Sequence, residues 1–298
     1  MTNSILIPTH ENWHKETKSV LLPTGIRMAY MECGNPQGKP LVMIHGFSDS
    51  SRIWRSVMQE MGDNYHFYAV DLRGFGLSDK PEQRVYTITE HAFDIAAWME
   101  RLELGKVLLI GHSMGSIVAQ TVAAFYPERV CGLALLSTFC HMHETPEQVR
   151  EVREFYDGLD IQHTSDDELQ KMFVPDPSKL ADASFLPGYL STLRGIRGRG
   201  LTAAWFGMSL ADNRNFLQFI KAPVLICWGS RDDIFTKEYQ DEMLVYLPEA
   251  EFEVFEGISH DIPTEVPRRT ANAVHTFFAT VNHQTIVKGG NDEEKNFK

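Results

Sequence analysis

Short apolar runs alternate with amphipathic segments over the first half of the chain. Residues 41–44 are apolar and residues 106–110 nearly so, as in strands that are buried on both faces of a sheet. After the second run, apolar residues recur at helical spacing from Ile117 to Phe125. Strand and helix keep alternating from Leu41 to Phe139, which predicts a parallel sheet with crossover helices.

The alternation stops after the strand around Leu136. The next predicted strand begins at Pro223, and the gap of roughly 85 residues far exceeds the dozen or so that a crossover needs. Charged and apolar positions within the gap predict helices over 147–156 and 166–173. We therefore expect an inserted helical cap that comprises residues 141–213. The core would comprise residues 1–140 and 214–285, and residues 286–298 would form a polar, disordered tail.

The pentapeptide Gly111-His112-Ser113-Met114-Gly115 falls where the strand at 106–110 must turn sharply into a helix. Such a turn strains its central residue, and glycines two positions to either side remove the resulting clash. Ser113 is then exposed at the carboxyl end of the sheet, as a nucleophile requires. A phosphate-binding loop is excluded, because the Gly-Lys-Ser/Thr sequence that it needs is absent here.

A serine nucleophile needs a histidine as base and an acid that orients this histidine. Residues 251–255 alternate like a strand, and the loop that follows them ends at His260. The chain has 12 histidines, and several of them have no such position. His91, for example, falls on a predicted surface helix, and His10, His14 and His283 lie in polar terminal stretches. We therefore predict that His260 is the base.

The acid should follow another strand, between the serine and the histidine in chain order. The strand predicted at 223–228 is followed by Asp232 and Asp233. We favour Asp232, because it stands three residues after the glycine that ends the strand, whereas Asp233 would meet solvent or cap a turn. Glu144 is a weaker alternative, since it is too distant from its strand for a short loop.

Two backbone donors are expected to stabilise the oxyanion. The first is the N–H of Met114, directly after the nucleophile. The second should come from the loop after the strand at 41–44, where Gly46 allows a close approach and makes the N–H of Phe47 the candidate. His45 could itself be a base, but its place before the glycine favours a structural hydrogen bond.

Taken together, these segments resemble the α/β-hydrolase family over roughly residues 18–282. The resemblance is carried by His45-Gly46-Phe47, Asp71 to Asp79, Gly111 to Gly115, Tyr126 to Val130, Gly229 to Asp232 and Gly257 to His260. It implies a mostly parallel sheet of about eight strands flanked by helices, and a triad formed by Ser113, Asp232 and His260. It also implies that the loop from Asp71 to Asp79 is architectural and packs near the oxyanion loop.

Composition narrows the possible partners and the location of the chain. Of its 298 residues, 43% are hydrophobic, enough for a sizeable core, and no apolar stretch approaches the length of a membrane span. The first residues do not form a signal peptide, so we expect a cytoplasmic protein. A net charge of −12 argues against nucleic acid or an anionic membrane as partner.

The four cysteines, Cys33, Cys131, Cys140 and Cys227, have no metal-binding spacing and are interpreted as free, buried thiols. His141 and His143 beside Cys140 loosely resemble metal ligands, but the sequence shows no second pair of ligands near them. We therefore expect neither a metal nor a cofactor. The sequence says nothing about the oligomeric state.

The predicted cap should close over Ser113 and select the substrate. Its larger apolar side chains are candidates for a pocket, and among them we select Trp205 as the substrate-binding residue. The others are Phe173, Phe185, Tyr189, Phe206 and Met208, most of which would be the core of the cap. Arg194, Arg197 and Arg199 could bind an anionic substrate, although a solvated, mobile hinge is the favoured interpretation.

These features predict a serine hydrolase that cleaves a carboxylic ester or lactone of a small to medium apolar substrate. A serine at position 113 disfavours dehalogenase or epoxide hydrolase chemistry, for which the same fold uses an aspartate. Carbon–carbon bond hydrolases and cofactor-free perhydrolases use the same triad and stay open as alternatives. A ligand receptor that has kept the fold is a further alternative, which the intact triad disfavours.

Overall fold

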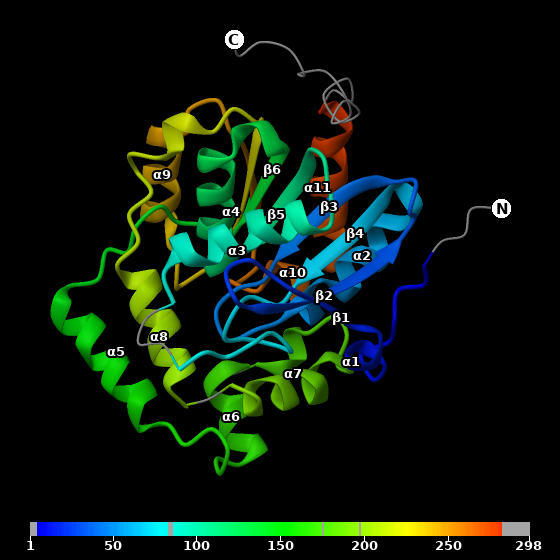
Figure 1. The fold of residues 1–298 in the computed structure, drawn as a ribbon. Helices are drawn as coiled ribbons and strands as arrows, with labels where there is room; N and C mark the ends of the chain where they lie inside the picture. Colours follow the sequence, from blue (N-terminus) through cyan, green and yellow to red (C-terminus); the bar gives the residue numbers. More distant parts are fainter. Residues whose placement is uncertain (1–4, 83–85, 175, 197, 282–298) are drawn as a thin grey trace, which may run out of the picture.

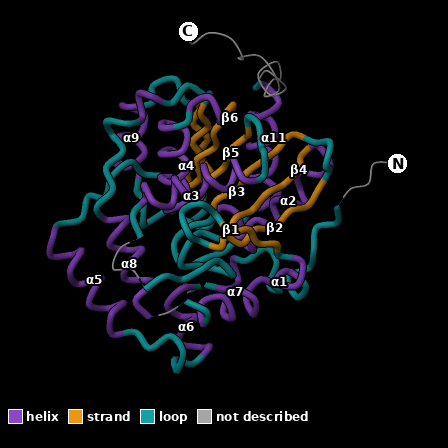
Figure 2. The backbone as a smooth tube through the Cα atoms, viewed as in Figure 1, coloured by secondary structure: helices purple, strands orange, loops and turns teal. Residues whose placement is uncertain are grey.

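The protein was analysed as a computed structural model that describes residues 5–82, 86–174, 176–196 and 198–281. Eight strands form one sheet in the order β1-β2-β4-β3-β5-β6-β7-β8 (Figures 1 and 2). The strands are β1 Lys18–Leu21, β2 Arg27–Gly34, β3 Lys39–Ile44, β4 Tyr65–Val70, β5 Val107–His112, β6 Val130–Leu136, β7 Val224–Gly229 and β8 Glu251–Phe255. The pairs β1–β2 and β2–β4 are antiparallel, and the five pairs from β4–β3 to β7–β8 are parallel, so the predicted mostly parallel sheet is confirmed.

Helices cover both faces of the sheet. Figure 1 shows α3 and α4 packed together on one face, and α2 and α11 packed together on the other. The helices associated with the sheet are α2 Arg55–Met61, α3 Ile88–Arg101, α4 Met114–Phe125, α9 Lys237–Tyr246, α10 Ile262–Glu265 and α11 Pro267–Thr280, with the short α1 Trp13–Glu16 near the N-terminus. The central strands β5, β6 and β7 are buried along their whole length, which explains their continuous apolar sequences.

Four helices lie between β6 and β7 in the chain and gather beyond one end of the sheet (Figure 1). They are α5 Pro146–Gly158, α6 Asp166–Phe173, α7 Phe185–Arg194 and α8 Gly198–Ser209, with α5 packed on α8 and α6 on α7. The two helices predicted in this segment are thus confirmed. Each begins with a capping box, formed by Thr145 and Gln148 in α5 and by Ser165 and Glu168 in α6.

Two sequence-based expectations about polar residues are wrong. His91 does not lie on a surface: its side chain is fully buried within α3, beside the ring of Tyr86. Arg194 is not a solvated hinge residue, because it ends α7 and binds Asp166 and the backbone oxygen of Thr164. The burial of His91 depends on how α3 packs, and the pairing of Arg194 with Asp166 joins two helices, so neither follows from the local sequence.

Some predictions fall outside the described residues. These are the disordered tail at 286–298, the end of the predicted core at 282–285, and Arg197. Every helix in the ranges given above is too short or too polar to cross a lipid bilayer.

Candidate active site

The turn between β5 and α4 has the strained geometry that the pentapeptide predicts. Ser113 lies at φ 53° and ψ −124°, a conformation that side-chain-bearing residues rarely adopt. A Cβ on Gly111 would lie 2.3 Å from the backbone oxygen of Gly115, and one on Gly115 would lie 2.4 Å from the backbone oxygens of Ile44 and His45. Since backbone cannot easily move aside, only glycine fits at both positions.

His260 and Asp232 meet after two neighbouring strands of the sheet. His260 Nδ1 lies 2.9 Å from Asp232 Oδ2, and the other carboxylate oxygen accepts hydrogen bonds from the N–H groups of Ile234 and Phe235. The carboxylate is therefore fixed by its own loop and aimed at the imidazole. Asp233 is exposed to solvent.

The surroundings of His260 favour its protonated form. Burial alone would lower the pKa of this imidazole, but the negative charge of Asp232 and the hydrogen bond to it outweigh burial and raise the pKa. Such a pairing stabilises the imidazolium that forms when a histidine takes a proton from a nucleophile. Among the hydrogen bonds of the described residues, none joins His260 to Ser113, and contacts of this kind often tighten only in a substrate complex.

The loop after β3 lies directly against Ser113. A Cβ on Gly46 would lie 3.1 Å from Ser113 Cβ, so the glycine allows this close approach. Within the part of the chain that the structure describes, the N–H groups of Phe47 and Met114 donate to no other group. Both are thus available as hydrogen-bond donors beside Ser113.

A second loop, residues 71–79, holds the loop after β3 in place through hydrogen bonds. The N–H of Leu72 donates to His45 Nε2 at 3.0 Å, and that of Ser51 donates to Asp71 Oδ1 at 2.7 Å. His45 Nδ1 lies 2.7 Å from the backbone oxygen of Gly46, so both ring nitrogens have structural partners, as expected from the sequence.

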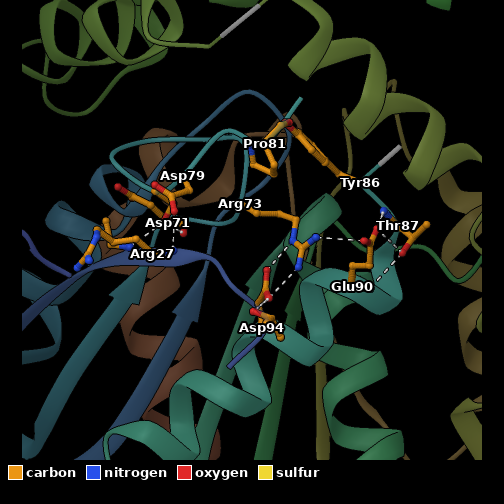
Figure 3. A network of polar contacts seen from close by, with 12 residues as sticks. Arg27, Asp71, Arg73, Asp79, Pro81, Tyr86, Thr87, Glu90 and Asp94 are labelled. Atoms are coloured by element: carbon orange, nitrogen blue, oxygen red, sulfur yellow. Dashed lines mark hydrogen bonds and ion pairs between the residues drawn. The ribbon is translucent and has the colours of Figure 1, made fainter. Parts of the chain in front are cut away.

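Loop 71–79 is anchored in turn to helix α3. Figure 3 shows the guanidinium of Arg73 directed at the carboxylates of Asp94 and Glu90. Arg73 binds Asp94 through two hydrogen bonds of 2.6 and 2.8 Å, and Glu90 through one of 3.1 Å. The contacts agree with the architectural role that the sequence indicated for this loop.

Sequence reasoning missed two residues that hold the backbone of His260. His112 Nε2 lies 3.0 Å from the backbone oxygen of His260, and the hydroxyl of Ser137 donates to the same oxygen at 2.7 Å. Burial, reinforced by the nearby His260, lowers the pKa of His112 to about 4, so its imidazole is neutral and serves as a donor. His112 is the variable position of the pentapeptide, which carries no signal of such a role.

Tyr189 of α7 contacts the loop after β3 through its hydroxyl, which lies 3.3 Å from Ser48 Oγ. Asp49, the next residue of that loop, is buried, and burial raises the pKa of its carboxyl well above the ordinary value. Tyr189 also stacks on Phe185, whose other neighbour is His10. Phe185 is therefore part of the core of these helices, whereas Tyr189 connects them to the predicted oxyanion loop.

Trp205 of α8 lies close to the same loop. Its ring meets that of Phe47 edge to face at 6.2 Å, and both contact Tyr156 of α5. The indole Nε1 is buried and has no hydrogen-bond partner among the described residues. Trp205 thus offers an apolar surface and an unused donor beside Phe47.

Comparison with known proteins agrees with this geometry. Residues 39–265 match the family model of the alpha/beta hydrolase fold. A monoacylglycerol lipase of Rattus norvegicus is 27% identical over 280 residues, which cover 86% of this chain and 80% of the relative. A cis-3-alkyl-4-alkyloxetan-2-one decarboxylase of Shewanella oneidensis is 27% identical over 265 residues, 80% of each chain.

A similar structure is that of a thermophilic esterase from Thermogutta terrifontis. It superposes with a TM-score of 0.75 at 26% identity, covering 89% of this chain and 98% of the esterase. The family model spans well over half of the chain, and the mostly parallel sheet of eight strands is the one that the resemblance implies. The chain belongs to the alpha/beta hydrolase fold family.

Proposed function

We propose that this protein is a carboxylic ester hydrolase whose nucleophile is Ser113. The observation that carries the proposal is the strained turn, which presents the hydroxyl at the end of the sheet where His260 and Asp232 form their pair. The relatives include a lipase, and a solved esterase shares the fold, which supports ester hydrolysis.

The reaction would proceed through an acyl-enzyme. Ser113 Oγ attacks the ester carbonyl while its proton passes to His260 Nε2, and Asp232 stabilises the imidazolium. The N–H groups of Phe47 and Met114 bind the oxyanion of the tetrahedral intermediate. His260 then returns the proton to the departing alcohol. A water molecule, activated by the same imidazole, releases the carboxylic acid and restores the serine.

Residues 141–213 would form the cap that selects the substrate. The contact between Trp205 and Phe47 supports this, since it places an apolar side chain of α8 next to the proposed oxyanion donor. We therefore propose an ester or lactone with a small to medium apolar group that packs against Trp205. Arg194 is engaged with Asp166, which argues against its use for an anionic substrate.

Carbon–carbon bond cleavage with the same triad is the second candidate. It is favoured by the decarboxylase relative, which has the same 27% identity as the lipase, over 265 residues against 280. A perhydrolase activity or a non-catalytic receptor has less support, because no contact described above favours either over hydrolysis.

Hydrolysis of p-nitrophenyl esters of graded acyl length tests the proposal. Ser113→Ala should lower kcat by at least about a thousandfold, whereas Ser209→Ala, a serine of α8 bonded only to its own helix, should not. A fluorophosphonate probe should label Ser113 and no other residue. Turnover that persists in Ser113→Ala would exclude the nucleophile, and an absence of any ester hydrolysis would favour the carbon–carbon or receptor alternatives.

The acid is tested by a matched pair of neighbours. Asp232→Asn should be far more damaging than Asp233→Asn, because only Asp232 contacts His260. The reverse order of activities would mean that the wrong carboxylate has been assigned.

We also propose a cytoplasmic location. The four cysteines are all free and buried in the structure, as in proteins of reducing compartments.

A further inference from the structure

A second cluster of chemically active side chains lies where the chain leaves the sheet after β6. Cys140 Sγ, a ring nitrogen of His141 and a carboxylate oxygen of Glu242 all lie within 4.8 Å of one another. Cys140 and His141 open the segment that contains α5 to α8, and Glu242 lies on α9. The fold thus adds the third ligand that the sequence alone did not show.

The imidazole of His141 faces this carboxylate without using it as a hydrogen-bond acceptor. Its Nδ1 lies 3.0 Å from Glu242 Oε2, yet the atom is buried and has no hydrogen-bond partner among the described residues. A protonated imidazole forms an ion pair with Glu242 at this distance, whereas a neutral imidazole and the carboxylate need a cation between them. A bound cation would therefore satisfy both atoms.

His143 fixes the carboxylate from the other side. Its Nε2 lies 2.9 Å from the same Oε2 of Glu242, and its ring stacks on Tyr239 at 4.0 Å. The backbone N–H of His143 also donates to the hydroxyl of Tyr239. Histidines that orient a ligating carboxylate in this way are typical of the outer shell of metal sites.

Charged groups beyond the cluster partly balance it. Arg214 Nη1 lies 3.8 Å from the other oxygen of Glu242, and Arg214 is itself paired with Asp212. The guanidinium of Arg214 is therefore neutralised by Asp212, which leaves the negative charge of Glu242 available to a metal.

We propose that Cys140, His141 and Glu242 bind one zinc ion, with His143 as the residue that positions the carboxylate. A thiolate, an imidazole and a carboxylate form a donor set typical of zinc, whereas calcium and magnesium prefer oxygen alone. Ordinary zinc–ligand bonds place such atoms roughly 3.5 Å apart, a separation that lies within the 4.8 Å limit found for the three side chains. Three protein ligands leave the fourth position to water.

The ion would fasten the start of the proposed cap to the catalytic core. Phe139, next to Cys140, stacks on Phe235 at 4.2 Å, and Phe235 in turn donates its N–H to Asp232. Zinc at this place would thus hold the first residues of the cap against the helix that follows the acid loop. It touches none of the residues proposed for ester hydrolysis, so the two proposals succeed or fail separately.

The test uses the full-length protein without a histidine tag, dialysed against a chelator and titrated with zinc chloride by calorimetry. One equivalent should bind, and the melting temperature should rise with zinc. Cobalt chloride should produce the near-ultraviolet thiolate-to-cobalt band and the strong visible bands of a tetrahedral site.

Variants assign the ligands. Cys140→Ser should abolish the thiolate-to-cobalt band, Glu242→Gln should weaken zinc binding by at least tenfold, and His143→Ala by about 10 to 100-fold. His163→Ala is the control, because His163 also pairs with a carboxylate, Asp160, but lies in an exposed turn far along the chain. Circular dichroism confirms that each variant is folded.

Two results would overturn the proposal. One is zinc binding that is equally strong in wild type, Cys140→Ser and Glu242→Gln, since it would locate the ion at other histidines. The other is the absence of a saturable equivalent in the wild type. If Cys140→Ser alone fails to fold, the zinc affinity of Glu242→Gln tests the proposal instead. The side chain of Glu242 is partly exposed, so its replacement needs no repacking of the core.

Discussion

The pair formed by Arg73 and Asp94 should be one of the most sensitive points of the fold. Asp94 has 1% of its side chain exposed and accepts two hydrogen bonds from Arg73 and one from the hydroxyl of Thr24. Replacing Asp94 with asparagine keeps the shape but leaves the buried guanidinium without its main counter-charge. Loss of one partner of a buried ion pair costs about 3–5 kcal/mol.

The expected loss lies at the lower end of this range. Glu90 still binds Arg73 at 3.1 Å, and its side chain is 36% exposed, so it compensates only in part. We therefore expect Asp94→Asn to lower the free energy of unfolding by about 3 kcal/mol. Urea unfolding followed by tryptophan fluorescence measures this value.

An exposed ion pair provides the control. Arg150 and Glu147 lie 2.9 Å apart with 56% and 71% of their side chains exposed, so Arg150→Ala should cost less than about 1 kcal/mol. Combining Asp94→Leu with Arg73→Met removes both charges and should recover much of the loss. The reasoning is refuted if Asp94→Asn costs no more than Arg150→Ala.

Three further predictions address the site and the core. Asp232→Asn should lower kcat/KM about 10⁴-fold and move the acid limb of the pH–rate profile to lower pH, because Asp232 helps raise the pKa of His260 and the proposed base acts when neutral. An acid limb that stays at the same pH contradicts this. Gly115→Ala should reduce esterase kcat about a hundredfold, since its Cβ meets backbone at 2.4 Å, whereas Gly158→Ala, with nothing within 4 Å, should be silent. Burial lowers the pKa of His91 from 6.5 to about 3, so below pH 6.5 the unfolded chain binds a proton that the folded chain does not, and stability falls. Between pH 6.5 and 5, urea unfolding should show that the wild type loses about 2 kcal/mol more stability than His91→Leu, and equal losses would exclude this role of His91.

The parts of the site that sequence predicts well have local signals. The turn at Ser113 needs glycine at two fixed positions, and the buried strands before Ser113 and Asp232 are short apolar runs followed directly by glycine-containing turns. The order of nucleophile, acid and base then follows from the order of the strands. Because each signal lies within a dozen residues, no knowledge of the tertiary structure is needed.

Other features arise only from contacts between distant segments. The burial of His91 depends on packing around α3, and the support of His260 by His112 and Ser137 depends on how β5 and β6 lie beside the loop after β8. Glu242 meets His141 and Cys140 because α9 follows β7, the parallel neighbour of β6. The sequence of one segment does not indicate which distant residue it will contact, so sequence periodicity cannot predict these contacts.

The way in which the proposed cap is attached separates specificity from chemistry. Its two ends meet, since His141 bridges to Asp212 and the N–H of Asn213 donates to the backbone oxygen of Cys140 at 2.8 Å. The buried amide of Asn213 also donates to Ile117 and Thr121 of α4, the helix that begins directly after Ser113.

Both ends of the proposed cap are therefore fixed to each other and to α4, the helix that follows the proposed nucleophile. The helices between these ends approach the proposed site through side chains such as Tyr189 and Trp205. Substitutions on the inner faces of α7 and α8 should consequently change which ester is accepted, while the strained turn, the acid loop and the base keep their geometry. An enzyme built in this way can exchange substrates without rebuilding its catalytic groups.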